Sequence, residues 1–174
     1  KFIFSSSRII PDKKYEWLIE SCSYMKNKIP LWLAGGVEGS YKKKLEDYAK
    51  KFDVELKFLG YIRLGNGLEE HYSSASLFAF PTPMEDFGLV PAESLICGTP
   101  CVIWGDDGGP TEQVIHGVNG FHAKPYDKKD FATKMDSIIE ENLKEKNKNQ
   151  IVESARKFTG EVQKKIYIGA IKTL

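Results

Sequence analysis

The sequence lacks a long hydrophobic run and a surplus of charge of one sign. None of its apolar stretches approaches the roughly 18 residues of a membrane-spanning helix, and no signal peptide is visible. The 25 basic and 24 acidic residues leave a net charge of +1, which argues against general nucleic-acid binding. The remaining class is a globular protein: 174 residues, 41% of them hydrophobic, suffice for one domain with a substantial core.

Cysteine is also scarce. The three thiols, Cys22, Cys97 and Cys101, are an odd number and do not have the paired spacing of a zinc site. We therefore expect buried, reduced thiols in a cytoplasmic protein. The chain begins at Lys1 without a methionine, so we expect it to be an excised domain.

A metal site is not expected from the remaining candidate ligands. Asp106 and Asp107 are adjacent and do not have the Asp-x-Asp spacing of a metal-dependent sugar-nucleotide site, so we assign them to loop solvation. Three histidines lack ligand spacing and are expected on the surface or in loops. They are His71, His116 and His122.

Short apolar strands alternate with helical stretches along the chain. The expected strands are 2–4, 31–33, 56–58, 77–80, 101–103 and 120–122, and the expected helices are 13–27, 40–52, 67–74, 88–97, 110–116 and 128–141. This alternation predicts an α/β, Rossmann-like, doubly wound parallel sheet of about six strands in one domain, 1–174. The segment 128–174 is expected to be helical, except for a polar turn or exposed stretch at 142–149.

The stretch from Glu85 to Glu93 has the most specific chemical pattern. Two carboxylates eight residues apart flank a Phe87-Gly88-Leu89 turn, and an apolar run with helical spacing follows. Glycine lets the backbone approach a ligand closely, and the helix directs free N–H groups and its positive dipole end at that ligand. Hydroxyl acceptors around an anion cradle suit a sugar that carries phosphate.

This stretch resembles the Glu-x7-Glu signature of retaining glycosyltransferases with the GT-B fold, specifically glycosyltransferase family 4. Six further segments are similar to family motifs in the same order, so the resemblance covers roughly the whole chain. These segments are 7–13, 31–36, 57–62, 98–102, 108–112 and 119–121. The departures are Ser7, where the family usually has glycine, and Trp104-Gly105, where a small residue and aspartate are more usual. Both affect the expected shape of the pocket.

For the phosphates, the resemblance implies that Arg8, Lys13 and the amides of the Phe87-Gly88-Leu89 turn stabilise the leaving diphosphate. An arginine fork and a lysine point charge match a diphosphate well. An isolated pair of this kind is more often solvated on the surface. Its position after the first strand, in the loop where the ligand is expected, favours phosphate binding.

For the rest of the donor, Glu93 would accept from the ribose hydroxyls, which a carboxylate can do. Glu85 would hold the donor sugar, by resemblance. Ile62 would offer its backbone to the base, although packing at a strand end is an equally open alternative. Glu112 is expected to cap its own helix and not to act in catalysis.

The resemblance thus implies the carboxyl-terminal, donor-binding half of a retaining, metal-independent hexosyltransferase, for which we expect no cofactor. The Glu-Asp-Phe-Gly variant with Pro91 is similar to that of mannosyltransferases and slightly favours GDP-mannose over a UDP-sugar. The acceptor, a glycan or lipid-linked sugar, would bind the missing amino-terminal domain, which would also carry any membrane association. The isolated chain is therefore expected to be inactive in transfer.

Two other classes were weighed against this one. A nicotinamide-dependent oxidoreductase should have Gly-x-Gly-x-x-Gly after the first strand, and Ser5-Ser6-Ser7-Arg8 does not match it. A non-catalytic nucleotide-sugar-binding module remains an alternative, although the presence of Arg8, Lys13, Glu85 and Glu93 favours an enzyme.

Overall fold

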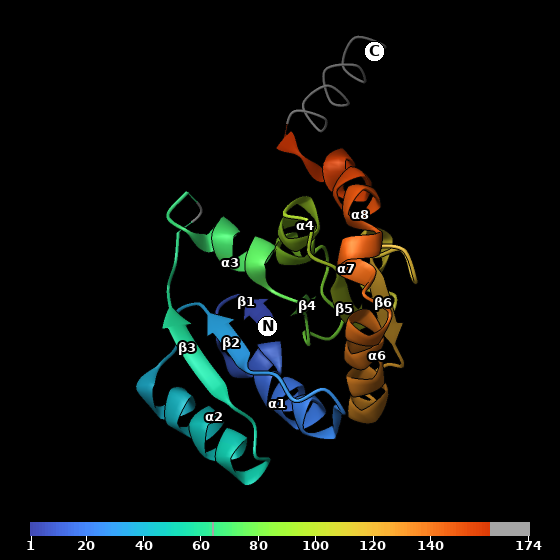
Figure 1. The fold of residues 1–174 in the computed structure, drawn as a ribbon. Coiled ribbons are helices and arrows are strands. Elements are labelled where there is room, and N and C mark those ends of the chain that lie inside the picture. Colours follow the sequence, from blue (N-terminus) through green and yellow to red (C-terminus); the bar gives the residue numbers. More distant parts are fainter. Residues whose placement is uncertain (64, 161–174) are drawn as a thin grey trace.

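The computed structural model describes residues 1–63 and 65–160. Within these residues six strands form one sheet in the order β3-β2-β1-β4-β5-β6, with every neighbouring pair parallel (Figure 1). The strands are β1 (Ile3–Ser6), β2 (Leu31–Ala34), β3 (Leu56–Gly60), β4 (Leu77–Ala79), β5 (Cys101–Trp104) and β6 (Gly120–Ala123). In the register of the central strands, Ile3 lies beside Leu31 on one side and Leu77 on the other.

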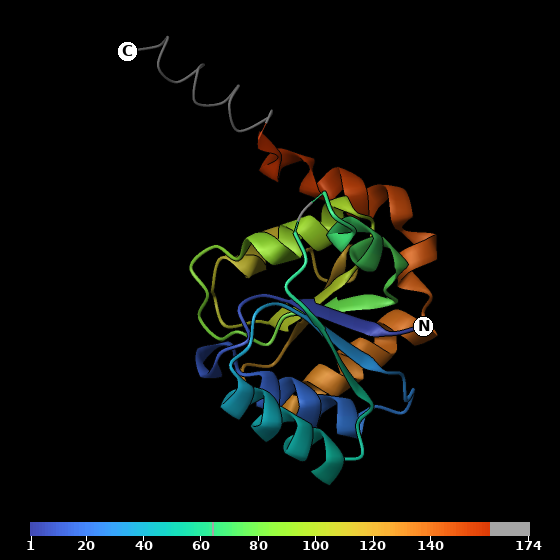
Figure 2. The same cartoon turned by 90° about the vertical axis from the view of Figure 1, so that its left-hand side faces the viewer.

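Helices cover both faces of the sheet (Figure 2). One face carries α1 (Tyr15–Tyr24), α2 (Gly39–Lys51) and α6 (Lys128–Glu140), and the other carries α3 (Leu68–Ser74), α4 (Leu89–Ile96) and α8 (Lys148–Ala155). Shorter elements complete the described chain: η1 (Pro11–Lys13), α5 (Pro110–Gln113), α7 (Leu143–Lys146) and η2 (Arg156–Phe158). The predicted parallel, doubly wound α/β sheet is confirmed.

The central strands are buried along their whole length, as expected for a parallel sheet with helices on both faces, although β1 ends in two buried serines. The two faces contribute separate cores. Leu18 and Phe131 pack on the α1 and α6 side, whereas Phe4 and Phe78 pack on the α3 and α4 side. This double layer holds the carboxyl ends of all strands, and the loops that follow them, in fixed positions.

Several boundary predictions were wrong. The predicted helix 110–116 ends at Gln113, because the backbone of Val114 is extended. The first helix does not run over 13–27: η1 precedes it, and α1 ends before Met25, whose backbone is extended. The stretch 142–149 is mostly exposed, as predicted, but it is not a turn, because it contains α7 and the start of α8. Leu143 is buried there, and the Lys144 ammonium donates to the carbonyls of Ser73 and Ala75 at the end of α3.

The carbonyls at the end of α3 have no partner within their own helix, so Lys144, which looks like surface charge in the sequence, acts as a cap.

The predicted helical segment 128–174 is helical in its described part, and residues 161–174 lie outside the described residues. The single-domain assignment 1–174 stays a prediction.

Three buried groups, two thiols and one tyrosine hydroxyl, should make the stability of the fold depend on pH in the alkaline range. Burial raises the pKa of the Cys22 and Cys101 thiols and of the Tyr15 hydroxyl to about 12. In the unfolded chain these groups ionise near about 8.5 and about 10, so above those values the unfolded chain binds fewer protons than the native one. The free energy of unfolding is therefore complete below about pH 8.5 and falls as pH rises towards about 12.

Urea unfolding at about pH 8 and about pH 10.5 measures this loss. The variant Cys22→Ala removes one of the titrating groups and should lose less stability between the two pH values than the wild type does. Equal urea midpoints for the wild type at both pH values would contradict the assignment.

Candidate functional site

The sheet reverses its direction of growth between β1 and β4. These strands are neighbours, but the chain after β1 leads to α1 on one face and the chain after β4 leads to α4 on the other. The loops 7–14 and 80–88 therefore diverge and leave a gap at the carboxyl ends of the central strands. In doubly wound sheets, ligands bind in this gap.

A cavity of about 220 Å³ opens beside this point. Its walls come from the loops after β1, β2 and β3 and from the first turns of α3 and α4, and three of the predicted site residues, Arg8, Ile62 and Glu93, line it. The other lining residues are Ser6, Ser7, Ala34, Gly35, Gly36, Tyr61, Leu68 and Val90. A mostly apolar hollow with a few convergent polar groups is typical of small-molecule sites.

Glu93 is held in place by a short relay from the sheet. The buried Tyr72 hydroxyl donates to Glu93 Oε2 at 2.8 Å and lies 2.6 Å from Ser6 Oγ. Since the single phenolic proton goes to Glu93, the Ser6 hydroxyl must donate to Tyr72. Burial, and then the Glu93 charge, raise the pKa of Tyr72, so it stays a donor. One carboxylate oxygen of Glu93 is thus anchored and the other is left for a ligand.

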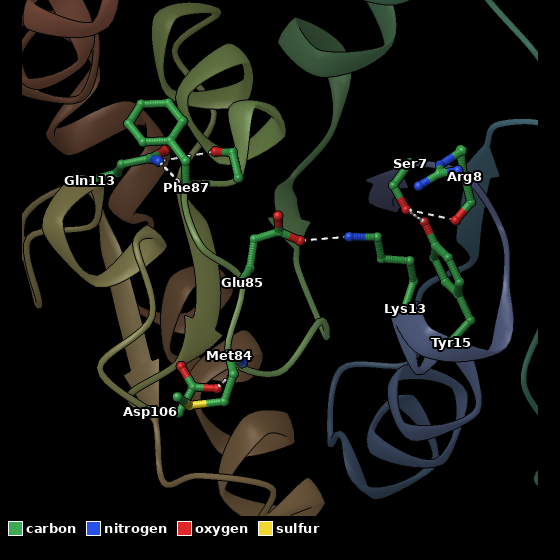
Figure 3. Close-up of polar contacts among 10 residues, drawn as sticks. Ser7, Arg8, Lys13, Tyr15, Met84, Glu85, Phe87, Asp106 and Gln113 are labelled. Carbon is green, nitrogen blue, oxygen red and sulfur yellow. Dashed lines mark hydrogen bonds and ion pairs between the residues drawn. The ribbon is translucent and has the colours of Figure 1, made fainter.

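Two of the predicted site residues, Lys13 and Glu85, form an ion pair across the gap. Lys13 Nζ lies 2.6 Å from Glu85 Oε2 and joins the loop after β1 to the loop after β4 (Figure 3). Both side chains are partly exposed, at 21% and 23%. Neither residue lines the cavity, whereas the nearby Arg8 does and is exposed. The structure thus separates the predicted residues into a cavity group and an ion pair beside it.

The predicted turn Phe87-Gly88-Leu89 lies at the beginning of α4, outside the cavity lining. Gly88 has φ +70, and a Cβ added there would lie 3.1 Å from Pro110, so this position needs glycine. Phe87 and Leu89 are exposed, at 46% and 66%. The first backbone N–H groups of α4 have no partner within the helix, as the predicted anion cradle requires.

The segment after β5 forms hydrogen bonds with the backbone of this turn and of the residues before it (Figure 3). Asp106 accepts from the Met84 amide at 2.8 Å, and the Gly109 amide donates to the Glu85 carbonyl at 2.8 Å. Gln113 Nε2 donates to the carbonyls of Phe87 and Gly88, at 2.5 and 3.0 Å. Four backbone positions between Met84 and Gly88 are therefore held by the segment that runs from the loop after β5 to the end of α5.

Two predictions about this bracing loop were wrong. Asp106 does not serve only solvation, because its carboxylate organises the turn before Glu85. Glu112 does not cap α5: the N-cap is Gly109 and no side chain caps the helix. The physical reason is that Gly109 already has a helical backbone conformation, so the chain enters α5 directly from the turn.

The two departures from the family pattern both anchor site loops. Ser7 Oγ donates to the Arg8 carbonyl at 3.1 Å and lies 2.7 Å from the Tyr15 hydroxyl of α1. Trp104 is buried, and its Nε1 donates to the Pro81 carbonyl at 2.7 Å. Ser7 thus fixes the Arg8 loop, and Trp104 fixes the start of the loop that leads to Glu85.

Residues 1–63 and 65–160 contain neither a candidate metal site nor a candidate membrane span. No group of three or more histidine, cysteine, aspartate and glutamate side chains in this range could hold a metal ion. No helix there is long and apolar enough to span a membrane. The cysteines in this range are unpaired, with Cys22 and Cys101 buried and Cys97 partly buried.

The glycosyl transferases group 1 family model matches residues 1–158. Among curated proteins, the chain is 36% identical over 104 residues to the alpha-1,3/1,6-mannosyltransferase alg-2 of Neurospora crassa, a match that covers 57% of this chain and 21% of the relative. The chain thus spans only about a fifth of that protein's length.

Solved structures give the same picture. The chain is 26% identical to Anabaena HepE in complex with UDP-glucose, with a TM-score of 0.80, over 99% of this chain and 49% of that one. It is 23% identical to the catalytic domain of cholesterol-alpha-glucosyltransferase from Helicobacter pylori, with a TM-score of 0.77, over 91% of this chain and 99% of that one. The predicted Rossmann-like fold of GT-B glycosyltransferases is confirmed by the sheet order and by these matches.

The cavity wall yields a test with a built-in control. An added Cβ at Gly35, which has φ +144, would lie 1.8 Å from the Ser7 carbonyl oxygen, whereas a Cβ at Gly36 would meet none of the described residues within 4 Å. We expect Gly35→Ala to lower the free energy of unfolding by at least about 2 kcal/mol and Gly36→Ala to change it by less than about 0.5 kcal/mol. Urea unfolding of both variants measures this, and equal effects would show that the cavity wall tolerates displacement.

Proposed function

Because the chain belongs to the glycosyl transferases group 1 family, we propose that it is the donor-binding domain of a retaining glycosyltransferase of family 4. It binds a nucleoside diphosphate sugar and positions it for transfer to a hydroxyl acceptor held by a second, amino-terminal domain. The observation that carries this proposal is the arrangement at the switch point. A cavity with an anchored carboxylate lies beside two cations and the beginning of a helix.

The cavity suits the nucleoside. Glu93 accepts hydrogen bonds from the ribose hydroxyls through its unanchored oxygen, and Ile62 offers its backbone to the base. Support comes from the lining, in which apolar side chains surround Glu93, and from the fixed orientation that Tyr72 gives the carboxylate. A carboxylate that is already oriented loses little conformational freedom when the ribose binds.

The diphosphate then extends from the cavity towards α4. Arg8 and Lys13 stabilise the charge that grows on the leaving group, together with the amides of Gly88 and Leu89. This is stabilisation by groups that are in position before the reaction. Glu85 holds the sugar while positive charge develops at its anomeric carbon. In this scheme Lys13 and Glu85 exchange their mutual ion pair for phosphate and sugar hydroxyls.

The donor has two candidates. The Glu-Asp-Phe-Gly sequence with Pro91 and the relative named as a mannosyltransferase favour GDP-mannose, which is our first candidate. The likeness to HepE in complex with UDP-glucose favours a UDP-hexose, which is the second. The reaction is proposed to need no metal, since Arg8, Lys13 and the helix dipole supply the positive charge.

A panel of GDP, UDP and their sugars, measured by thermal shift and calorimetry with and without EDTA, tests the proposal. Ligands that bind only the native state raise the unfolding temperature, so stabilisation by one nucleotide series names the base. Binding that appears only after magnesium or manganese is added would refute metal independence. No stabilisation by any member of the panel would refute the proposed function.

The assigned role of Glu93 predicts a loss of nucleoside affinity. Glu93→Gln should weaken binding by roughly 1–3 kcal/mol, because a charged hydrogen bond to ribose is lost. Tyr72→Phe should cause a smaller loss, because it keeps the carboxylate but removes the bond that orients it. Glu85→Gln is the matched control and should not weaken binding of the free diphosphate. Calorimetry that found unchanged affinity in Glu93→Gln would remove Glu93 from the ribose site.

The cations make a separate prediction. Arg8→Ala and Lys13→Ala should lower the affinity for the nucleoside diphosphate much more than the affinity for the matching nucleoside, because these side chains are assigned to phosphate alone. Each charged hydrogen bond to phosphate contributes roughly 1.5–3 kcal/mol. Parallel titrations with both ligands measure the difference, and an equal loss for both would mean that the substitutions act on the fold.

A further inference from the structure

Gln113 is a buried amide outside the predicted site. It ends the short helix α5, it is 1% exposed, and its amino group donates to two consecutive carbonyls, those of Phe87 and Gly88. Its carbonyl oxygen, Oε1, is buried and has no hydrogen-bond partner among residues 1–63 and 65–160. The reverse orientation would place that oxygen against two other carbonyls, so the amino group must face the turn.

The hydrogen bonds from Gln113 to the two carbonyls also determine where the next two backbone N–H groups point. In a planar trans peptide the C=O and the following N–H point in opposite directions. The carbonyl of Phe87 shares its plane with the Gly88 N–H, and the carbonyl of Gly88 shares its plane with the Leu89 N–H. Since Gln113 holds both carbonyls, both N–H groups point away from it.

These two N–H groups lie where α4 begins, where backbone donors have no helical partner. Figure 3 shows Gln113 on one side of the turn and Lys13 with Glu85 on the other. The amide therefore sets two free donors towards the side of the turn where the ion pair lies. An anion between Lys13 and the beginning of α4 would meet both.

The buried, unpaired Oε1 indicates that Gln113 is not explained by stability alone. A buried polar atom without a partner costs free energy, and an apolar side chain of similar size would avoid that cost. What an apolar side chain cannot do is hold two carbonyls in one direction.

We propose that Gln113 is a positioning residue that orients the Gly88 and Leu89 amides for the diphosphate of the donor. The proposal rests on the proposed function, since it assigns these amides to a phosphate ligand. It predicts that Gln113 affects the difference in affinity between the nucleoside diphosphate and the nucleoside. Gln113 does this without contacting the ligand.

The experiment uses two variants that remove the donors: Gln113→Leu, and Gln113→Met, which is closer to glutamine in length. Calorimetry compares guanosine with GDP, or uridine with UDP, according to the base that the panel identifies. We expect nucleoside affinity to stay unchanged and diphosphate affinity to fall about tenfold in both variants, the size of one charge-assisted hydrogen bond.

A control variant distinguishes the orientation of the Gly88 and Leu89 amides from a general loosening of the segment around them. Asp106→Ala frees the Met84 amide in the turn before Glu85, at the other end of the segment 84–88, and should keep the full preference for diphosphate over nucleoside. An equal loss in Asp106→Ala would overturn the proposal, because loosening alone would then explain the effect.

Amide NMR of the wild-type chain gives a readout that does not depend on the variants folding. Addition of the diphosphate should shift the N–H resonances of Gly88 and Leu89, whereas the nucleoside should not. Absence of that shift would overturn the inference. If the wild type binds the diphosphate and both Gln113 variants bind it equally well, the inference is overturned but the proposed function stands. A wild type that binds no nucleoside diphosphate would overturn the proposed function and the inference with it.

Discussion

β1 and β4 are neighbours in the sheet, yet the chain leaves them towards opposite faces. Every feature of the candidate site depends on this divergence. It separates the loop that carries Arg8 and Lys13 from the loop that carries Glu85, and it places the beginning of α4 beside the gap. Because helices cover both faces of the sheet, the gap at the strand ends remains the accessible place for a ligand.

The two sides of the gap are fixed by different means. On the cavity side, a buried relay from Ser6 through Tyr72 orients Glu93. On the helix side, the loop after β5 holds the backbone around Glu85 through Asp106, Gly109 and Gln113. Groups held by secondary contacts keep their geometry when the ligand arrives, which is what electrostatic catalysis requires. The site is thus shaped largely by residues that line no part of the cavity.

Local patterns in the sequence were sufficient for the strands and for most of the helices. They also indicated the candidate residues, whose roles stay predictions. Glu85 and Glu93 lie on one loop-to-helix segment, so their spacing could be interpreted directly. The supporting contacts could not be predicted in this way. Tyr72 lies 21 residues from Glu93, Asp106 lies 22 from Met84, and Gln113 lies 26 from Phe87. Such contacts depend on which strands are neighbours, and no local periodicity contains that information.

The ion pair between Lys13 and Glu85 also has a kinetic consequence. Two opposite charges at 2.6 Å form a dipole whose field falls off quickly with distance. Within the described residues Arg8 lines the cavity with an exposed guanidinium and no acidic partner, so its field extends furthest into solution. On the proposed function, the attraction of an approaching diphosphate, which salt screens, would come mainly from Arg8. Lys13 would act after contact, so that Arg8 governs how quickly the donor arrives and Lys13 how long it stays.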